Sequence, residues 1–508
     1  MDRTRSSIKN VTITMIGAIV TMLLQLVNRK IFVLFLSSEY LGLNGLFSDI
    51  LAMLSLSELG IGTAMIYALY KPVAENDTEK IKSLMLLYKK IYTIIGCTVL
   101  GLGGVLTPFL SVLINEMPDI PYIHLYFIMY VLDAGISYFY TYKRSLIICN
   151  RENYISSLTM MISSVLLRGA QLLVLIFTHN YFLFLLVQIV FTRAENIVIS
   201  KIADRKYPYL KERDIQPLDK ETTTQIKRNT AAMLTHKIGT VVAIGTDNII
   251  ISKILGLSVL GIYSNYHLLT VTINGMIVRV INSVTSNVGN LVVEKEKRES
   301  ERVFYNILFV NFWVYSWCAV CFCCLLQPFV ELWLGEAYLL SDITVWIIIA
   351  VFYFNGMRST LLVFRDAAGI FYQDRYKAII EATVNIIVTI PLTISLGVVG
   401  VKLGTLISVL GTAFWIEGYV LFKYFFEKRF TGYMIKQGWY AIVTIGISAL
   451  TRMLCAYVDG SDIRSFILQC AICLLIPNVI LLVLFFNTKE FQFFLSIACR
   501  GINKFKKK

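Results

Sequence analysis

The chain has 508 residues, of which 56% are hydrophobic and only 16% are charged, and this composition excludes an ordinary soluble domain. The formal net charge is +14, but the basic residues gather in short loops between long apolar segments, so we attribute them to membrane topology and expect no nucleic-acid partner. We expect the final lysines to contact anionic membrane lipids.

About fourteen apolar segments of membrane-crossing length follow one another along the chain. The first group is predicted at residues 8–36, 43–70, 86–114, 122–148, 154–178 and 181–202. The second group is predicted at residues 229–255, 263–293, 303–332, 343–366, 378–396 and 402–424, and two further spans at 436–457 and 465–487. The predicted fold class is therefore an all-α polytopic membrane protein.

Lysine and arginine alternate sharply between the loops. Among the basic residues of the predicted loops and ends, Arg464 alone falls on the side opposite to the others. By the positive-inside rule, this asymmetry predicts a multi-pass protein of the cytoplasmic (inner) membrane with both termini in the cytoplasm. The loops on the predicted outer side are very short, and we expect no soluble domain there that could hold a catalytic site. The chain is therefore predicted not to be an enzyme.

The predicted halves resemble each other. Three dipeptides recur at a separation of about 220 residues, namely Leu41-Gly42 with Leu260-Gly261, Pro108-Phe109 with Pro328-Phe329, and Arg144-Ser145 with Arg358-Ser359. We predict an N-terminal six-helix bundle at 1–202, a cytoplasmic linker at 203–228, a C-terminal six-helix bundle at 229–424, two additional helices at 436–487 and a basic tail at 488–508. Bundles repeated in parallel around an axis along the membrane normal predict a central cavity and alternating access.

Polar residues inside the spans form seams that should face the bundle interior or water. Asn28 and Arg29 belong to the seam of the first span, Glu58 to the second, Asp247 to the seventh and Arg279 to the eighth. Intramembrane ion pairs, for example of Arg279 with Glu58 or Asp247, are the structural alternative to a binding role.

Further charges inside the predicted spans are Asp133, Arg168, Arg193, Glu195 and Arg358. Arg193 and Glu195 lie two residues apart on a helix, so they do not face each other and each needs a partner elsewhere.

Arginine binds phosphate oxygens through a planar fork and stays charged, so a cavity with several arginines would attract a phosphate or pyrophosphate. The candidate ligands of such a group are Arg29, Arg168, Arg279 and Arg358. The candidate polar or ion-coupling groups of the cavity are Asn28, Glu58, Asp133 and Asp247. We expect no cofactor, and coupling to H⁺ or Na⁺ is left open.

We expect no metal site. Cysteines concentrate at Cys318, Cys321, Cys323 and Cys324 in one predicted span, and at Cys470 and Cys473 in another. Neighbouring positions on a single helix do not easily surround an ion, and no histidine lies nearby in the sequence.

Three sequence runs carry a resemblance to a known family: "VNRKIFVLFLSSEYLGLNGLFSDI" from residue 27, "TDNIIISKILGLSVLGIYSNY" from residue 246 and "RSTLLVFRDAAGIFYQDRYK" from residue 358. The chain resembles the Wzx-type oligosaccharide-lipid flippases of the multidrug/oligosaccharidyl-lipid/polysaccharide (MOP) exporter superfamily. The resemblance implies movement of an undecaprenyl-pyrophosphate-linked oligosaccharide across the membrane for surface polysaccharide synthesis. It implies membrane lipids, and polymerases and glycosyltransferases of the same pathway, as further candidate partners. It also matches Arg29 to a cationic position of the family and Asp247 to the acidic residue of its Thr-Asp motif.

Two rival functions remain. A MATE-type multidrug exporter of the same superfamily would have about twelve spans and a cavity biased toward acidic groups. A membrane polysaccharide polymerase or glycosyltransferase would need a sizeable outer loop. An ATP-driven transporter is excluded, because no glycine-rich loop ending in Gly-Lys-Ser/Thr is present.

Overall fold

The computed structural model describes residues 3–55, 61–115, 118–150, 152–212, 245–282, 297–370, 376–458 and 462–495, together with residues 215, 218, 224 and 373. The chain divides into two compact units, Met1–Ser264 (unit 1) and Asn265–Lys508 (unit 2). The division falls inside one helix, α11 (Leu257–Asn282). Helices form all the regular secondary structure of the described residues, as the apolar segments predict.

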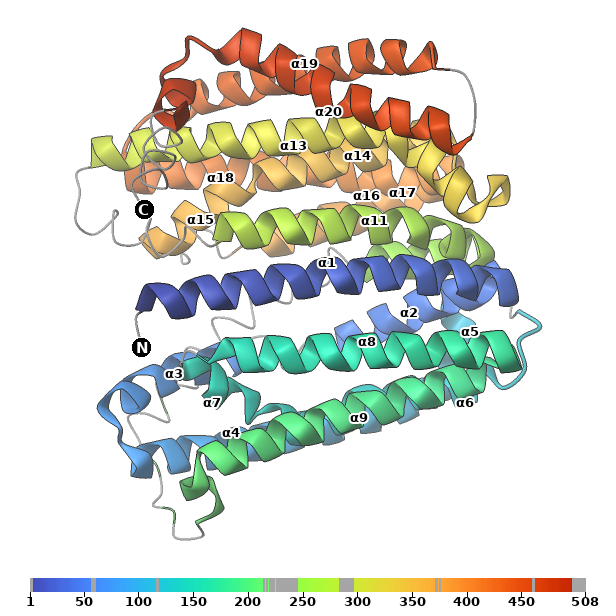
Figure 1. Ribbon diagram of the computed structural model, residues 1–508, viewed down its shortest axis with the longest axis vertical. Helices are drawn as coiled ribbons and strands as arrows, with labels where there is room; N and C mark the ends of the chain where they lie inside the picture. Colours follow the sequence, from blue (N-terminus) through green and yellow to red (C-terminus); the bar gives the residue numbers. More distant parts are fainter. Residues whose placement is uncertain are drawn as a thin grey trace. The chain divides into compact units, whose positions relative to one another are not determined.

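Unit 1 is a bundle of long helices that follow the predicted spans closely. Its elements are α1 (Arg3–Phe35), α2 (Ser38–Leu54), α3 (Ile61–Glu75), α4 (Thr78–Leu106), η2 (Thr107–Phe109), α5 (Leu110–Leu113), α6 (Ile123–Thr141), α7 (Arg144–Cys149), α8 (Asn153–Thr178), α9 (Tyr181–Lys206) and η3 (Pro208–Lys211). Within the unit, α8 packs against both α1 and α9, and α6 packs against α4 and α9 (Figure 1).

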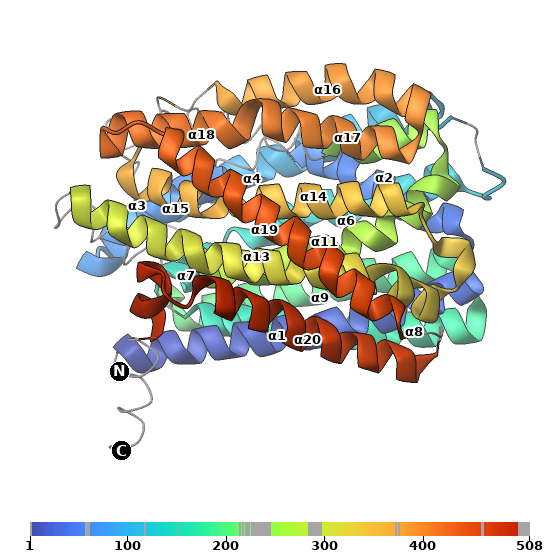
Figure 2. The same ribbon diagram turned by 90° about the horizontal axis from the view of Figure 1, so that it is seen from above.

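Unit 2 contains the second set of spans and the two additional helices. Its elements after α11 are α13 (Lys297–Leu334), η4 (Glu336–Tyr338), α14 (Asp342–Met357), α15 (Ser359–Ala368), α16 (Lys377–Leu396), α17 (Val398–Ser408), η5 (Val409–Ala413), α18 (Phe414–Leu421), η6 (Phe422–Phe426), α19 (Thr431–Ala456) and α20 (Ile463–Phe485). The helices α19 and α20 both pack on α13 and on each other (Figure 2).

Nine helices of the described residues are long and apolar enough to cross a membrane, so the chain is a multi-pass membrane protein. Apolar side chains on the surface of α20 agree with a lipid environment, since Val483 is 75% exposed and Ile463 is 68% exposed. A water-soluble helix would bury such residues. The predicted total of about fourteen spans stays a prediction. Most of the predicted seventh span and half of the linker lie outside the described residues, and the predicted domain boundaries stay predictions.

Two of the repeated dipeptides mark breaks or bends in corresponding helices. The helix pairs α6/α7 and α14/α15 are each interrupted at the Arg-Ser dipeptide, because α7 begins at Arg144 and α15 begins at Ser359. The Pro-Phe dipeptides differ. Pro108 lies in the 3₁₀ turn η2 that ends α4, whereas Pro328 lies inside the continuous helix α13. A proline therefore ends the helix in the first repeat and is accommodated in the second.

The repeated Leu-Gly dipeptides contact each other at the starts of α2 and α11, within unit 1. A Cβ atom added to Gly42 would lie 2.0 Å from the carbonyl oxygen of Leu257, and one added to Gly261 would lie 1.9 Å from the carbonyl oxygen of Ser38. Each glycine thus packs on the residue four positions before the other glycine. This reciprocal contact is what a duplicated sequence produces around a local two-fold axis, and only glycine allows so close an approach.

Candidate functional site

Two of the predicted arginines come together in unit 1, on α1 and α8. The side-chain amide of Asn28 donates to the backbone carbonyl of Arg168 over 3.3 Å, which joins the two helices at this level. Arg29 follows on α1 and donates from Nη2 to the hydroxyl of Ser264. The phenol of Tyr130 on α6 lies within the electrostatic range of both guanidinium groups. We call Asn28, Arg29, Tyr130, Arg168 and Gln171 the arginine cluster.

Arg168 is the cation of this cluster with the weakest compensation. It lies near the middle of α8, and its Nη1 donates to the amide oxygen of Gln171 over 3.0 Å. Its Nε is buried without a hydrogen-bond partner, as is Nε2 of Gln171. No carboxylate of the described residues lies within ion-pair distance of Arg168. An intramembrane charge is costly unless something compensates it, so this guanidinium is suited to receive an anion.

Aromatic side chains surround the arginine cluster. The hydroxyl of Tyr130 donates to the side-chain oxygen of Asn44 on α2 and lies 3.3 Å from the hydroxyl of Tyr181 on α9. The ring of Tyr181 in turn packs edge-on against Phe32 and Tyr126, with ring centroids 5.9 and 5.0 Å apart. Such edge-to-face contacts hold aromatic side chains in fixed orientations. The positions of the polar groups in the cluster are therefore determined by a packed wall.

Asp133 on α6, a predicted acidic group of the cavity, has hydrogen-bonding and ionic partners on α9. It accepts from the side-chain amide of Gln188 over 3.2 Å and lies 3.6 Å from Nη2 of Arg193. Arg193 also donates to the backbone carbonyls of Leu132 and Asp133, over 2.5 and 2.9 Å. Asp133 thus joins α6 to α9 by an ion pair. Such a pair is the structural alternative to a binding or ion-coupling role for this residue.

Arg193 and Glu195 each find a partner on another helix, as their spacing predicts. Glu195 on α9 pairs with Arg144, with 2.6 Å between Oε1 and Nη2. Arg144 is the residue at which α7 begins, so this ion pair attaches the broken helix to α9.

The remaining predicted residues belong to other segments of the chain or lie outside the described part. Asp247 is buried in the helical segment 245–254 of unit 1. Arg279 belongs to unit 2, where it is exposed three residues before α11 ends at Asn282. Glu58 lies outside the described residues, so the predicted ion pair of Arg279 with Glu58 stays untested.

Arg358 stands in a buried ionic network of unit 2. Its guanidinium donates to Glu417 on α18 over 3.0 and 2.8 Å, to Glu381 on α16 over 3.1 and 3.4 Å, and to Asn355 over 2.9 Å. Lys377 on α16 adds a second cation, 2.6 Å from Oε1 of Glu417. We call Arg358, Lys377, Glu381 and Glu417 the ionic network. Its charges balance, and the helix break at Arg358 is tied to α16 and α18.

Three members of the ionic network, Lys377, Glu381 and Glu417, were not selected as candidate residues in the sequence analysis. Glu417 and Glu381 both fall inside predicted spans, and a carboxylate inside an apolar span could have been recognised as a candidate functional residue. Lys377 precedes its predicted span by one residue and resembles an interfacial anchor. No local pattern shows that these residues meet Arg358, because they lie between 19 and 59 positions away in the chain.

The comparisons with known proteins agree with this architecture. The family model described as "Polysaccharide biosynthesis protein" matches residues 7–286. Among solved structures, the lipid II flippase MurJ in an inward closed conformation is similar with a TM-score of 0.67 and 14% identity, covering 93% of this chain and 98% of that one. The comparison with curated protein sequences gave no match.

Two multidrug transporters of the MATE family are also similar. An inward-facing MATE transporter of the MOP superfamily has a TM-score of 0.59 and 15% identity, covering 81% of this chain and 98% of its own. The Vibrio cholerae transporter VcmN has a TM-score of 0.60 and 15% identity, covering 84% and 98%.

These likenesses define the class by its fold, a polytopic helical protein with a fold like that of MurJ and of the MATE transporters. Because the family model covers more than half of the chain, the protein belongs to the polysaccharide biosynthesis protein family. The resemblance carried by the sequence runs is thereby confirmed.

Proposed function

We propose that this protein is a flippase that moves an undecaprenyl-pyrophosphate-linked oligosaccharide from the cytoplasmic to the outer leaflet of the cell membrane. The lipid-linked sugar leaves chemically unchanged, so the protein acts as a transporter and not as an enzyme. Membership of the polysaccharide biosynthesis family and the MurJ-like fold support this function. The observation that carries the proposal is Arg168, a mid-helix guanidinium with a buried, unpartnered Nε.

In this proposal the pyrophosphate contacts Arg168 and Arg29. Their guanidinium groups lie within the electrostatic range of the same phenol, that of Tyr130, and paired donors on two helices suit the spread charge of a pyrophosphate. Arg279, exposed at the end of α11, is a candidate for a later contact along the path.

Arg358 takes a different role in the proposal. Two carboxylates already engage both edges of its guanidinium, and a third anion there would lie beside them and be repelled. We therefore assign Arg358 to the packing of unit 2 rather than to the substrate.

We further propose an orientation with both termini in the cytoplasm, supported by the distribution of lysine and arginine. A proton or Na⁺ gradient is the proposed driving force, with Asp247 as the candidate coupling group because its carboxyl group is buried inside a span. Glycosyltransferases and the polymerase of the pathway would supply and consume the cargo.

The test is the movement of a fluorescently labelled undecaprenyl-pyrophosphate oligosaccharide in proteoliposomes, followed by quenching from the outside. We expect protein-dependent movement that the Arg168→Gln variant loses and that the control variant Arg452→Gln keeps. Arg452 is a suitable control because it lies on α19, half-exposed, and pairs with Asp342.

Two outcomes would contradict the proposal. Normal movement by Arg168→Gln and by Arg29→Gln would remove the assignment of the site. Failure to move any lipid-linked sugar, together with uptake of a lipophilic cation, would establish the multidrug-exporter alternative that the MATE-like fold keeps open.

A further inference from the structure

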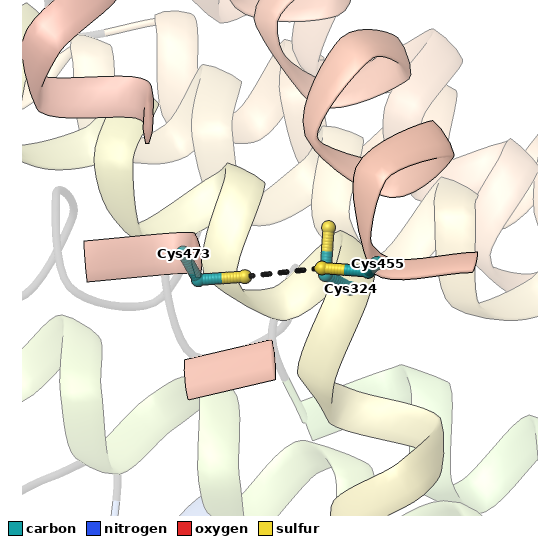
Figure 3. A group of neighbouring side chains, drawn as sticks. All are labelled: Cys324, Cys455 and Cys473. Carbon is teal, nitrogen blue, oxygen red and sulfur yellow. Dashed lines mark hydrogen bonds between the residues drawn. The ribbon is translucent and has the colours of Figure 1, made fainter. Parts of the chain in front are cut away.

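Three buried cysteines from three different helices of unit 2 lie together. They are Cys324 on α13, Cys455 on α19 and Cys473 on α20 (Figure 3). Their sulfur atoms all lie within 4.8 Å of one another, and the Sγ atoms of Cys455 and Cys473 are 3.9 Å apart. The expectation of no metal site considered the cysteines of one helix at a time, whereas these three thiols come from three helices.

The separations of the sulfur atoms match those of a metal–thiolate site. Three thiolates bound at about 2.3 Å around one ion in their plane lie about 4 Å from one another. The observed spacing therefore needs only small side-chain adjustments to receive an ion. A disulfide would require the sulfur atoms of one pair to approach to about 2 Å, so the spacing fits three ligands better than one bond.

The chemistry of the donors selects the ion. In the described part of the chain, no histidine or carboxylate joins the three sulfur atoms to complete a fourth position. The nearby backbone carbonyl of Cys473 already accepts hydrogen bonds from Trp317, over 3.0 Å, and from the thiol of Cys321, over 3.8 Å. Structural zinc requires four ligands, whereas a soft monovalent ion such as Cu(I) is satisfied by thiolates alone.

We propose that Cys324, Cys455 and Cys473 form a binding site for a soft monovalent metal ion, Cu(I), that joins α19 and α20 to α13. Each thiol that becomes a ligand releases its proton to the solvent. An ion held by all three helices stabilises the folded state over any state in which the two additional helices separate from the bundle.

The experiment titrates Cu(I) against a coloured Cu(I) chelator, using the full-length protein, reduced and free of oxygen, in detergent micelles. We expect one equivalent of Cu(I) to be withdrawn from the chelator by the unmodified protein, with a rise in unfolding temperature. Cys455→Ser and Cys473→Ser should lose this equivalent. The control variant Cys97→Ser, which changes an exposed cysteine of α4, should retain it.

The Cys324→Ala variant provides a second test with a small apolar replacement, and its unfolding temperature without copper shows whether it is folded. Retention of the copper equivalent by Cys324→Ala or by both serine variants would overturn the proposal. So would a tighter Zn²⁺ equivalent that depends on the same cysteines, or a Cys455–Cys473 disulfide that persists in the reduced protein.

Discussion

Two arginines inside the predicted spans, Arg168 in unit 1 and Arg358 in unit 2, stand in opposite electrostatic settings. Arg358 is 8% exposed and is neutralised by two carboxylates, with Lys377 completing the ionic network. Among the described residues, Arg168 has only amide partners and keeps an unsatisfied Nε. The first arrangement satisfies its own charges, whereas the second leaves a positive potential that a ligand can use. Residue type alone does not distinguish a structural arginine from a binding one.

Two corresponding arginine-glutamate pairs, one in each unit, also show how the setting of an arginine differs between the units. Arg144 with Glu195 and Arg358 with Glu417 both attach a broken helix to the last span of the same set. The side chains of the first pair are 22% and 18% exposed, and those of the second are 9% and 1% exposed. The duplication has therefore kept the ion pair but has buried it more deeply in unit 2.

The largest effect on stability is expected from the Arg358→Gln variant. It leaves Glu381 and Glu417 buried with only Lys377 as a cation, and breaking a buried ion pair in this way costs about 3–5 kcal/mol. Loss of helical circular dichroism during unfolding in sodium dodecyl sulfate measures the effect of a variant in either unit, and tryptophan fluorescence reports unit 2 separately, because all the tryptophans of the chain lie there. The matched variant Arg144→Gln should lose clearly less, and equal losses would contradict the difference in burial between the two pairs.

A smaller loss is expected from Gly42→Ala or Gly261→Ala in unit 1. The added methyl group would meet a backbone carbonyl that cannot rotate away, and overpacking of this kind costs about 1–3 kcal/mol. Size-exclusion chromatography after a heat step would measure the folded fraction. The control is Gly104→Ala, where no atom lies within 4 Å of the added Cβ; its behaviour should equal that of the unmodified protein. A folded fraction for Gly42→Ala as high as that of the control would refute the close packing.

A local effect is expected at the start of α20, outside the membrane-spanning segments. The hydroxyl and amide of Ser465 donate to the carboxylate of Asp462, over 2.6 and 3.2 Å, and these hydrogen bonds hold the pKa of that carboxyl group below its usual value. A lowered pKa gives stabilisation that is present above the pKa of the unfolded chain and is lost as the pH falls through the folded value.

Protection of the first amides of α20 against hydrogen exchange, taken relative to the intrinsic exchange rate at each pH, should therefore be high at neutral pH and should fall in acid. Asp462→Ala should show low protection at both pH values, whereas the loop variant Asp119→Ala should change nothing in α20. Exchange that is independent of Asp462 would show that this cap is unimportant.

The smallest change in stability is expected from Arg168→Gln. Removing an uncompensated charge from a membrane helix relieves a cost, so the unfolding temperature should stay the same or rise while transport is lost. Differential scanning fluorimetry measures the unfolding temperature, and the proteoliposome assay measures transport, so the two effects are determined separately. The dye should react neither with thiols nor with lipids. Destabilisation comparable to that of Arg358→Gln would mean that both arginines are structural.

Much of the helical architecture could be predicted from the sequence. The length and hydropathy of the apolar segments predicted the described long helices, although several begin earlier than predicted, such as α4 at Thr78 rather than at residue 86. A membrane forces each crossing segment to satisfy its own backbone hydrogen bonds, and this is why apolar length is informative. The helix breaks at 141–144 and 357–359 were not predicted, since each lies within a segment that was read as one span, although Arg144 and Arg358 mark their positions. The repeat was visible in the Leu-Gly dipeptides, but their mutual contact was not.

The sequence by itself determined the membrane class, the helices and the fact that Arg193 and Glu195 need separate partners, because these follow from local periodicity and from the cost of burying a charge. Only the tertiary structure decided which partners they have. It paired Arg358 with Glu417 and left Arg168 with Gln171, and it gathered Cys324, Cys455 and Cys473 from three helices. These contacts join residues far apart in the chain, and no local pattern encodes which helix faces meet.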